Sequence, residues 1–210
     1  MTRTRIAKID PNSPDDGLIR EAVKLMMQGF PIAFPTETVY GLGVCARSPK
    51  GIEAIYAIKG RSQGKPLQLM ISDLDMLKLV IKTIPDKATP LMEKYWPGPL
   101  TIIFKTNTTF AAAQQRATVA IRYPNHPIPL SIIRRLENPL AATSANLSGR
   151  LSPRRAVEVF EQLDGKIPLI LDGGSCTVGQ ESTLVDMTLE KPKIVRQGAL
   201  SAEELSPYLS

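Results

Sequence analysis

Two kinds of hydrophobic pattern alternate along this chain. Apolar residues recur at helical spacing between residues 15 and 28, and a short apolar run typical of a buried strand follows at residues 31–34. The same patterns predict further helices over residues 51–58, 73–81, 86–95, 128–136, 153–163 and 201–209. They predict further strands over residues 67–71, 100–105, 118–122, 168–171, 182–187 and 193–196, and one that begins at Leu140. Interleaved helices and strands predict an α/β domain built on a twisted, mixed sheet.

The length and the termini fit one folded unit. A chain of 210 residues suits a single domain over residues 1–210, and it is long enough to bury a sizeable core. We expect residues 1–14 to be a loose segment or to pair with a sheet edge. Those residues contain no apolar core of a secretory signal, and no apolar run in the chain is long enough to span a bilayer.

Charge and cysteine content narrow the function classes. The net charge of +6 favours anionic partners such as nucleotides, pyrophosphate or RNA. Cys45, Cys176 and the single His126 are too few for an ordinary zinc site, and a reduced, cytoplasmic protein is the simpler interpretation. No Ser-His-Asp order, carboxylate pair or GxGxxG sequence stands out, which gives little support to a hydrolase or a dinucleotide oxidoreductase.

A polar segment, Thr143–Gly149, follows the strand that begins at Leu140. It contains Ser144, Asn146 and two further hydroxyls. Ligands of open α/β sheets bind at the carboxyl ends of strands, where small polar side chains can hydrogen-bond a nucleotide. A polar turn that caps the next helix explains the same residues, so this segment alone leaves both interpretations open.

A second loop, PTETVYGLG, directly follows the strand at residues 31–34. Thr36, Glu37 and Tyr40 could form the floor of a pocket for a small polar ligand, and Gly41 and Gly43 permit close approach of the backbone. The alternative is an ordinary turn in which threonine hydroxyls bond backbone groups.

A third loop, KGRSQGKP, carries Lys59, Arg61 and Lys65 with glycines between them. These cations could wrap a polyphosphate, although the spacing is not that of a P-loop. Cations at a helix C-terminus also complement the helix dipole, so phosphate binding is one of two open interpretations.

Other strand ends carry isolated polar residues. Arg122 ends the strand at residues 118–122 and could face a carboxylate, while Arg196 ends the last strand and Ser182 begins the strand at residues 182–187. His126 is conceivable as a general base, but a turn residue before a helix fits it better.

These motifs together resemble a known family. The segments PTETVYGLG, KGR with KPL, YWPGPLT, AIRYP, TSANLSG, ESTLVD and IVRQG occur in the order found in the YrdC-like proteins, the threonylcarbamoyl-AMP synthases. The resemblance implies a YrdC-like α/β domain around a positively charged concave site. It also implies a reaction in which L-threonine, bicarbonate and ATP give L-threonylcarbamoyladenylate and pyrophosphate, with Mg²⁺ carried by ATP and no metal bound by the protein alone. The implied partner is a tRNA-modifying transferase complex that passes the group to an adenosine beside the anticodon.

The resemblance also implies roles for individual residues. Thr36 and Tyr40 would line the amino-acid side, and Arg122 with Ser182 would hold the threonine carboxylate. Lys59, Arg61 and Lys65 would face bicarbonate and the phosphates, with Lys59 and Arg61 as catalytic residues that also contact the nucleotide. Ser144, Asn146 and Arg196 would bind the nucleotide.

Several departures from the family pattern keep other functions open. Met70 stands where some members carry a histidine near threonine, and Ser62 and Gln197 replace common prolines, which could loosen their loops. We expect no counterpart of the extra C-terminal domain of longer members. The alternatives are a non-catalytic module that binds double-stranded RNA or tRNA directly, an enzyme that adenylates carbamoyl phosphate, and a paralogue that has lost activity.

Overall fold

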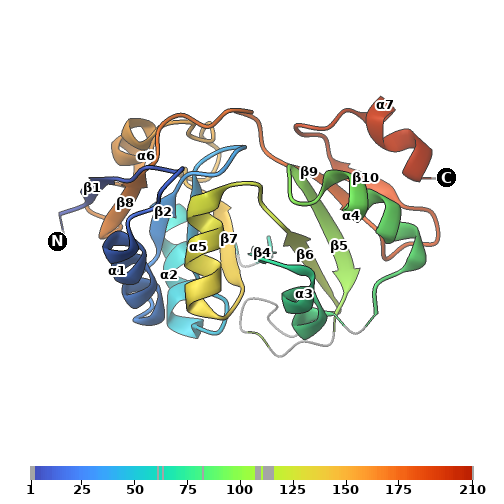
Figure 1. Cartoon of the computed structure of the whole chain (residues 1–210), viewed down its shortest axis with the longest axis horizontal. Helices are drawn as coiled ribbons and strands as arrows, with labels where there is room; N and C mark the ends of the chain where they lie inside the picture. The colour runs from blue at the N-terminus through green and yellow to red at the C-terminus, as the bar shows by residue number, and fades with distance from the viewer. Residues whose placement is uncertain are drawn as a thin grey trace.

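A computed structural model describes residues 3–60, 62, 64–81, 83–106, 110 and 116–209 of the chain. Within these residues ten strands form one mixed sheet in the order β1-β8-β2-β3-β7-β4-β6-β5-β9-β10 (Figure 1). The strands are β1 (Arg5–Lys8), β2 (Ile32–Phe34), β3 (Gly41–Cys45), β4 (Gln68–Met70), β5 (Leu100–Lys105), β6 (Thr118–Arg122), β7 (Leu140–Ser144), β8 (Leu169–Asp172), β9 (Thr183–Asp186) and β10 (Lys193–Arg196). The predicted α/β fold with a mixed sheet is therefore confirmed.

Helix ends follow the capping residues of the sequence. The helices are α1 (Asp16–Met27), α2 (Pro49–Lys59), α3 (Leu74–Val80), α4 (Thr89–Tyr95), α5 (Pro127–Leu136), α6 (Ala156–Leu163) and α7 (Ala202–Leu205), with 3-10 turns η1 (Asp86–Ala88) and η3 (Ser206–Tyr208). Asp15, Ser48 and Asp73 accept hydrogen bonds from the first turns of α1, α2 and α3. His126 caps α5 through Nδ1, the turn role that the sequence favoured for it.

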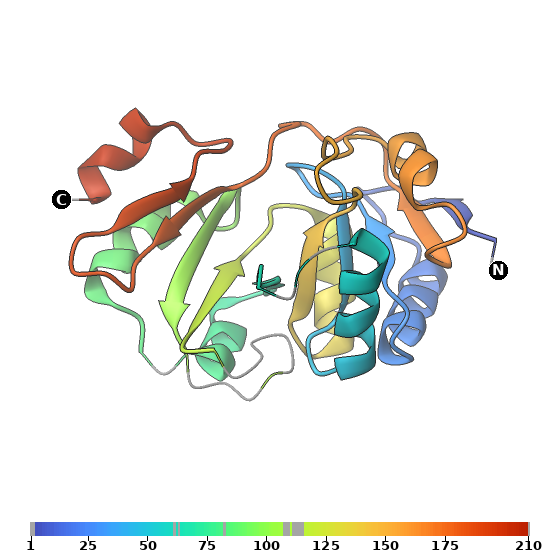
Figure 2. The ribbon, with the colours of Figure 1, turned by 180° about the vertical axis from the view of Figure 1, so that it is seen from behind.

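The sheet has two halves that differ in how they are covered. Strands β1, β8, β2, β3 and β7 lie between helices, with α1 and α5 on the face nearest the viewer in Figure 1 and α2 and α6 on the face turned toward the viewer in Figure 2. Strands β6, β5, β9 and β10 carry α3 and α4 on one face only. Side chains that leave the uncovered face of these strands are therefore free to line a cleft.

The residue pattern of β6 shows this difference directly. Val119 and Ile121 are buried on the helix-covered face, whereas Thr118 and Ala120 alternate with them toward the other face. The covered half shows no such alternation, because all three residues of β2 are buried. One-sided alternation thus marks the half of the sheet that forms the cleft.

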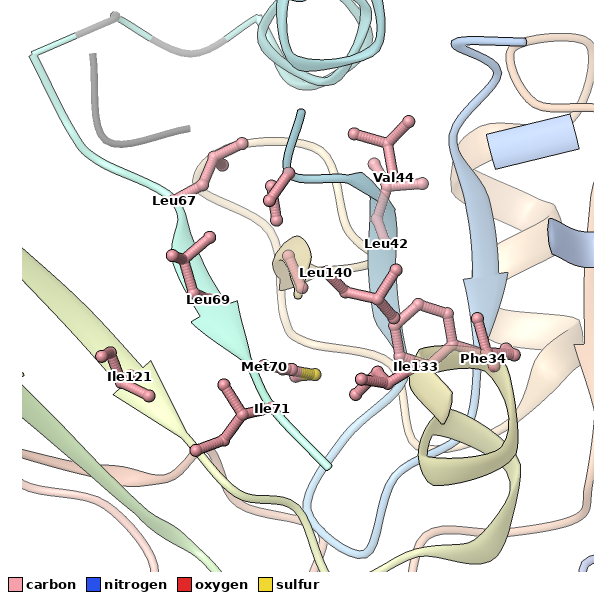
Figure 3. Close-up of a cluster of buried hydrophobic side chains, with 14 of the residues drawn as sticks. Phe34, Leu42, Val44, Leu67, Leu69, Met70, Ile71, Ile121, Ile133 and Leu140 are labelled. Carbon is pink, nitrogen blue, oxygen red and sulfur yellow. The ribbon is translucent and has the colours of Figure 1, made fainter. Parts of the chain in front are cut away.

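The apolar core runs across the short central strand β4. Figure 3 shows Leu69 and Met70 of β4 between Ile121 on one side and Leu42 and Leu140 on the other. Met70 is 2% exposed within this cluster. Adjacent residues of a strand point to opposite faces, so Leu69 and Met70 place the core on both faces of β4 and join the two halves of the sheet.

Three sequence predictions about elements were wrong or incomplete. Residues 41–45, expected as a loop, form the central strand β3, because Gly41 and Gly43 let the Phe34 ring lie against the strand. An added Cβ at either glycine would lie 2.9 Å from that ring. Of the two expectations for residues 1–14, edge pairing holds for residues 5–8, since β1 is the end strand of the sheet and pairs in parallel with β8. Helix α6 begins at Ala156 rather than near Pro153.

Candidate active-site cleft

A cleft of about 710 Å³ opens on the uncovered face of the sheet. It lies between β6, β5, β9 and β10 on one side and β7 with the end of α2 on the other, and Figure 2 shows this face of the sheet. Its described walls are made mostly of small or polar side chains with four cations and one carboxylate, from Val39, Lys59, Gly64, Lys65, Pro66, Gln68, Thr101, Ile103, Thr118, Ala120, Arg122, Ala142, Thr143, Ser144, Asn146, Ser148, Gly149, Glu181, Ser182, Leu184, Val195 and Arg196.

Arg122 forms a buried ion pair in the cleft wall. Its Nη2 lies 2.9 Å from Oε1 of Glu37, and the two side chains are 3% and 10% exposed. Nε donates to the carbonyl oxygen of Gly98 at 3.3 Å, and Oε1 of Glu37 also accepts from the amide of Asn125. The Nη2 contact with Glu37 is an ion pair without hydrogen-bond geometry, and Oε2 of Glu37 has no hydrogen-bond partner among the described residues. A buried guanidinium whose hydrogen bonds are not all made within the protein is suited to receive an anionic ligand group.

Hydroxyl and amide groups continue from Arg122 across the cleft floor. The Ser182 and Thr101 hydroxyl oxygens are 2.7 Å apart, and the Thr101 hydroxyl donates to Oε1 of Gln68. Thr101 pairs with Arg122 between β5 and β6, which places these side chains on the same face of the sheet. This chain of polar groups fixes the Ser182 hydroxyl close to the guanidinium groups of the cleft.

Arg196 forms a second ion pair at the edge of the cleft. Its Nη1 lies 2.5 Å from Oε2 of Glu181, with 43% and 32% of the two side chains exposed. Nη2 donates to the carbonyl and hydroxyl oxygens of Ser182. The other oxygen of Glu181 accepts from the Ser152 hydroxyl on the opposite side of the cleft.

Lys59 holds the polar loop after β7. Its ammonium donates to the carbonyl oxygens of Ser144 and Asn146 and to Oδ1 of Asn146, and its own carbonyl accepts from the amide of Ser148. Three acceptors match the three N–H donors of a lysine ammonium. The amide nitrogen of Asn146 closes the loop further by donating to the Arg150 carbonyl. The loop is therefore shaped mainly by one buried lysine, 4% exposed.

Comparison with known proteins places this cleft in a family. The family model that covers Sua5, YciO and YrdC, described as "Telomere recombination", matches residues 24–198. The chain belongs to the Sua5/YciO/YrdC family. The resemblance that the sequence motifs suggested is confirmed.

Relatives in the family share both sequence and fold with the chain. It is 40% identical over 203 residues to the threonylcarbamoyl-AMP synthase of Bacillus subtilis, a match that covers 95% of this chain and 59% of that protein. Against the threonylcarbamoyl-AMP synthase of Pyrococcus abyssi it is 41% identical over 193 residues, covering 91% of this chain and 57% of the other. The crystal structure of P. abyssi Sua5 complexed with L-threonine superposes with a TM-score of 0.93 at 38% identity, covering 99% of this chain and 61% of that one. The chain thus spans less than two thirds of these relatives.

Seven of the ten site residues predicted from the family's motifs line the cleft. The seven that line it are Lys59, Lys65, Arg122, Ser144, Asn146, Ser182 and Arg196. Arg61 lies outside the described residues. Five loops or strand ends deliver these groups, and all but the loop after α2 adjoin strands, as the sequence predicted for polar residues at strand ends.

Thr36 and Tyr40, the other two predicted residues, do not line the cleft. The Thr36 hydroxyl accepts from the amide of Val39 and donates to the carbonyl of Val39, so it forms the turn that was the alternative interpretation. The Tyr40 hydroxyl donates to the carbonyl of Gly174 at 2.7 Å, away from the cleft. Burial, together with the nearby Asp172, raises the pKa of Tyr40 and keeps the phenol protonated.

The three departures from the family pattern also have defined positions. Met70 belongs to the apolar core and does not line the cleft. The Ser62 hydroxyl accepts from the amide of Gly64, and the Gln197 amide donates to the carbonyl of Leu200. Both residues that replace prolines therefore make local hydrogen bonds within their loops.

Sequence reasoning did not single out several polar residues of the cleft wall, and it did not predict the ionic partner of Arg122. Gln68, Thr101 and Glu181 line the cleft, and Glu37 pairs with Arg122 behind its wall. Glu37 and Glu181 stand in the PTETVYGLG and ESTLVD motifs, so a search for carboxylates beside arginines could have found them. Gln68 and Thr101 carry no comparable signal, because single polar residues in apolar strands are common.

The described residues contain no group of three or more His, Cys, Asp or Glu side chains placed to hold a metal ion. No described helix is long and apolar enough to cross a membrane.

Proposed function

We propose that this protein is a threonylcarbamoyl-AMP synthase, which joins L-threonine, bicarbonate and ATP to give L-threonylcarbamoyladenylate and pyrophosphate. The observation that carries the proposal is a buried arginine, Arg122, in the wall of a cleft, in a chain that shares its fold with a relative crystallised with L-threonine. All three substrates carry anionic groups, and four cations line the described cleft.

Substrate positions follow from the donors that each wall offers. Arg122 and Ser182 are suited to hold the threonine carboxylate, since both line the cleft and the Ser182 hydroxyl contacts Thr101, which pairs with Arg122 between β5 and β6. Ser144, Asn146, Lys65 and Arg196 line the same cleft and would bind the nucleotide and its phosphates. Arg61, which lies outside the described residues, stays a proposed phosphate ligand from the sequence.

The proposed reaction has two bond-forming steps. The neutral amine of threonine attacks bicarbonate or CO2 and gives an N-carboxylate, with water released when bicarbonate reacts and a proton released to solvent when CO2 reacts. An oxygen of that carboxylate then attacks the α-phosphorus of ATP, and the bond to the bridging oxygen breaks as pyrophosphate leaves. The protein's part is to orient these groups and to place cations where charge accumulates.

Lys59 contributes to this scheme by positioning. Its ammonium already bonds three oxygens of the 144–146 loop, so we infer that it shapes the nucleotide wall instead of contacting a phosphate directly. Mg²⁺ would neutralise the pyrophosphate as it leaves. With a single carboxylate on the described wall, the cleft fits a magnesium ion held mainly by ATP phosphates.

Partners and location belong to the same proposal. The adenylate is a mixed anhydride that water destroys, which favours transfer to a tRNA-modifying threonylcarbamoyl transferase complex in the cytoplasm. Double-stranded RNA binding without catalysis is the less favoured alternative, because compact Ser, Thr and Asn groups in a cleft suit a small molecule better than a helix surface.

The test is pyrophosphate release from ATP and bicarbonate with threonine, with serine or with no amino acid. We expect release that depends on threonine and an adenylate product that decays in buffer. Arg122→Ala should abolish the threonine dependence, and intact release in that variant would refute the carboxylate assignment. Absence of release from the wild-type protein, together with salt-sensitive RNA binding, would favour the binding module.

A further inference from the structure

Glu181 is an unexpected group in a cleft for anions. It is the one carboxylate on the described cleft wall, and it lies among Arg196, Lys59 and hydroxyl groups. A negative charge at this point repels the phosphates that the proposed reaction must bind. Its position therefore needs a reason connected with Arg196, the cation that it contacts.

The contacts of Arg196 all point to residues 181 and 182. Nη1 meets the Glu181 carboxylate at 2.5 Å, and Nη2 donates to the carbonyl oxygen of Ser182 at 2.8 Å and to its hydroxyl oxygen at 3.2 Å. The guanidinium is held in the cleft wall by these bonds. Glu181 and Ser182 together thus occupy the donors with which Arg196 would bind a phosphate group in a two-point contact, and Glu181 is the charged competitor.

Another ligand can replace Glu181 as the partner of Arg196 at little cost. The side chains of Arg196 and Glu181 are 43% and 32% exposed, and ion pairs that water reaches contribute little to stability. Burial opposes ionisation of Glu181, but the Ser152 hydrogen bond and the Arg196 charge outweigh it and hold its pKa below the ordinary value. The carboxylate is therefore charged at neutral pH.

We propose that Glu181 is a positioning residue that competes with phosphate groups for Arg196 and so limits how tightly pyrophosphate stays bound. In this scheme the carboxylate orients Arg196 in the wall, the polyphosphate of ATP displaces it, and its return helps pyrophosphate to leave. The scheme rests on the proposed function, since pyrophosphate is the product of that reaction.

A purely structural role for Glu181 predicts the opposite change in pyrophosphate affinity when the carboxylate is removed. Its hydrogen bond with Ser152 joins the segment before β9 to the segment after β7, so it could serve only to brace the two sides of the cleft. Loss of a brace would weaken the binding of every ligand. Loss of a competitor would strengthen the binding of pyrophosphate.

The experiment is calorimetric titration of inorganic pyrophosphate and ATP into wild-type protein and Glu181→Gln. We expect pyrophosphate to bind about tenfold more tightly to the variant, since one unit charge a few ångströms from the ligand has been removed. Steady-state kinetics should show a lower KM for ATP together with a lower kcat, because product release becomes slow. Unchanged or weaker pyrophosphate binding would overturn the proposal.

Two further variants separate the causes. Glu158→Gln removes the same charge from a carboxylate that pairs with Arg155 on the N-terminal turn of α6, outside the cleft, and should leave pyrophosphate binding unchanged. In the background of Arg196→Ala, Glu181→Gln should no longer tighten binding, and tightening that persists there would refute the action through Arg196. Glu181→Ser gives the same test if the glutamine variant does not fold. Wild-type protein that binds neither ATP nor pyrophosphate would overturn this proposal and the proposed function together.

Discussion

Two arginine–glutamate pairs stand in the wall of one cleft, and water reaches them to very different extents. Arg122 and Glu37 are 3% and 10% exposed, whereas Arg196 and Glu181 are 43% and 32% exposed. The buried pair is fixed by the Gly98 carbonyl and the Asn125 amide. The exposed pair joins two partly solvated side chains at the edge of the cleft.

The difference shows that identical residue types can serve opposite purposes. Separation of a buried pair leaves an uncompensated charge in a medium that cannot solvate it, so Glu37 must stay with Arg122 when a ligand binds in the cleft. An exposed pair can separate at little cost because water solvates both partners. We therefore regard Arg122–Glu37 as a permanent frame and Arg196–Glu181 as an exchangeable contact.

The largest expected effect is on the unfolding free energy when the glutamate of each pair is replaced by alanine. Glu37→Ala is expected to lower the free energy of unfolding by about 3–5 kcal/mol, the usual result of an unpaired buried charge. Glu181→Ala should lower it by no more than about 1 kcal/mol, because its pair is partly solvated. Urea unfolding of both variants measures the difference.

A variant that removes both charges of the buried pair sharpens that comparison. Arg122→Met combined with Glu37→Leu removes both charges, and it should be more stable than Glu37→Ala alone. Equal losses for Glu37→Ala and Glu181→Ala would show that burial does not distinguish the pairs.

The two lysines of the cleft wall differ in burial as the two ion pairs do, since Lys59 is buried and Lys65 is exposed. Lys59→Met leaves three oxygens of the 144–146 loop without their donor, and it should cost about 1–3 kcal/mol of unfolding free energy. Lys65→Met should leave the unfolding free energy unchanged, because Lys65 is exposed. ATP should bind less tightly to both variants, through loss of loop shape in the first and loss of charge in the second. Thermal unfolding and ATP titration of the pair provide the test.

Much of the fold was predictable because most elements carry a clear local signal. The strand at Leu140 and the helix after Asp73 appear where the apolar pattern and the capping residue put them. β3 escaped prediction because Gly41 and Gly43 suit a loop in isolation, and only the ring of Phe34 on the neighbouring strand explains them. That explanation depends on pairing between strands, which the local sequence does not contain.

The site was predictable as far as its cations and hydroxyls stand at strand ends. Arg122, Ser144 and Arg196 close β6, β7 and β10 and meet in the cleft as expected. The orientation of Thr36 and Tyr40 was not predictable, since polar side chains after a strand can turn toward a ligand or toward the backbone. Here both found acceptors inside the protein.

Acid should remove the exposed pair first. The Ser152 and Arg196 contacts outweigh burial and depress the folded pKa of Glu181, so its stabilisation is full above the unfolded value of about 4.3 and is lost as pH falls through the lower folded value. The difference in unfolding free energy between wild type and Glu181→Gln, about 1 kcal/mol or less at neutral pH, should therefore shrink towards pH 3. Lys59 and Arg196 are the cations that face this carboxylate. Urea unfolding between pH 3 and 7 measures it, and a difference that grows on acidification would contradict the assignment.

Salt should give the smallest effect and the most selective one. Ions screen charges that water reaches, with a Debye length that falls from about 10 Å at 0.1 M to about 3 Å at 1 M, and they screen buried pairs much less. Added sodium chloride should therefore reduce the stability difference between wild type and Glu181→Gln by a few tenths of a kcal/mol while leaving that of Glu37→Gln in place. The comparison of each variant with wild type at the same salt concentration cancels the general effect of salt on folding. Equal salt sensitivity of the two differences would mean that water reaches Arg122 as readily as Arg196, and the frame would then be as exchangeable as the contact at the edge.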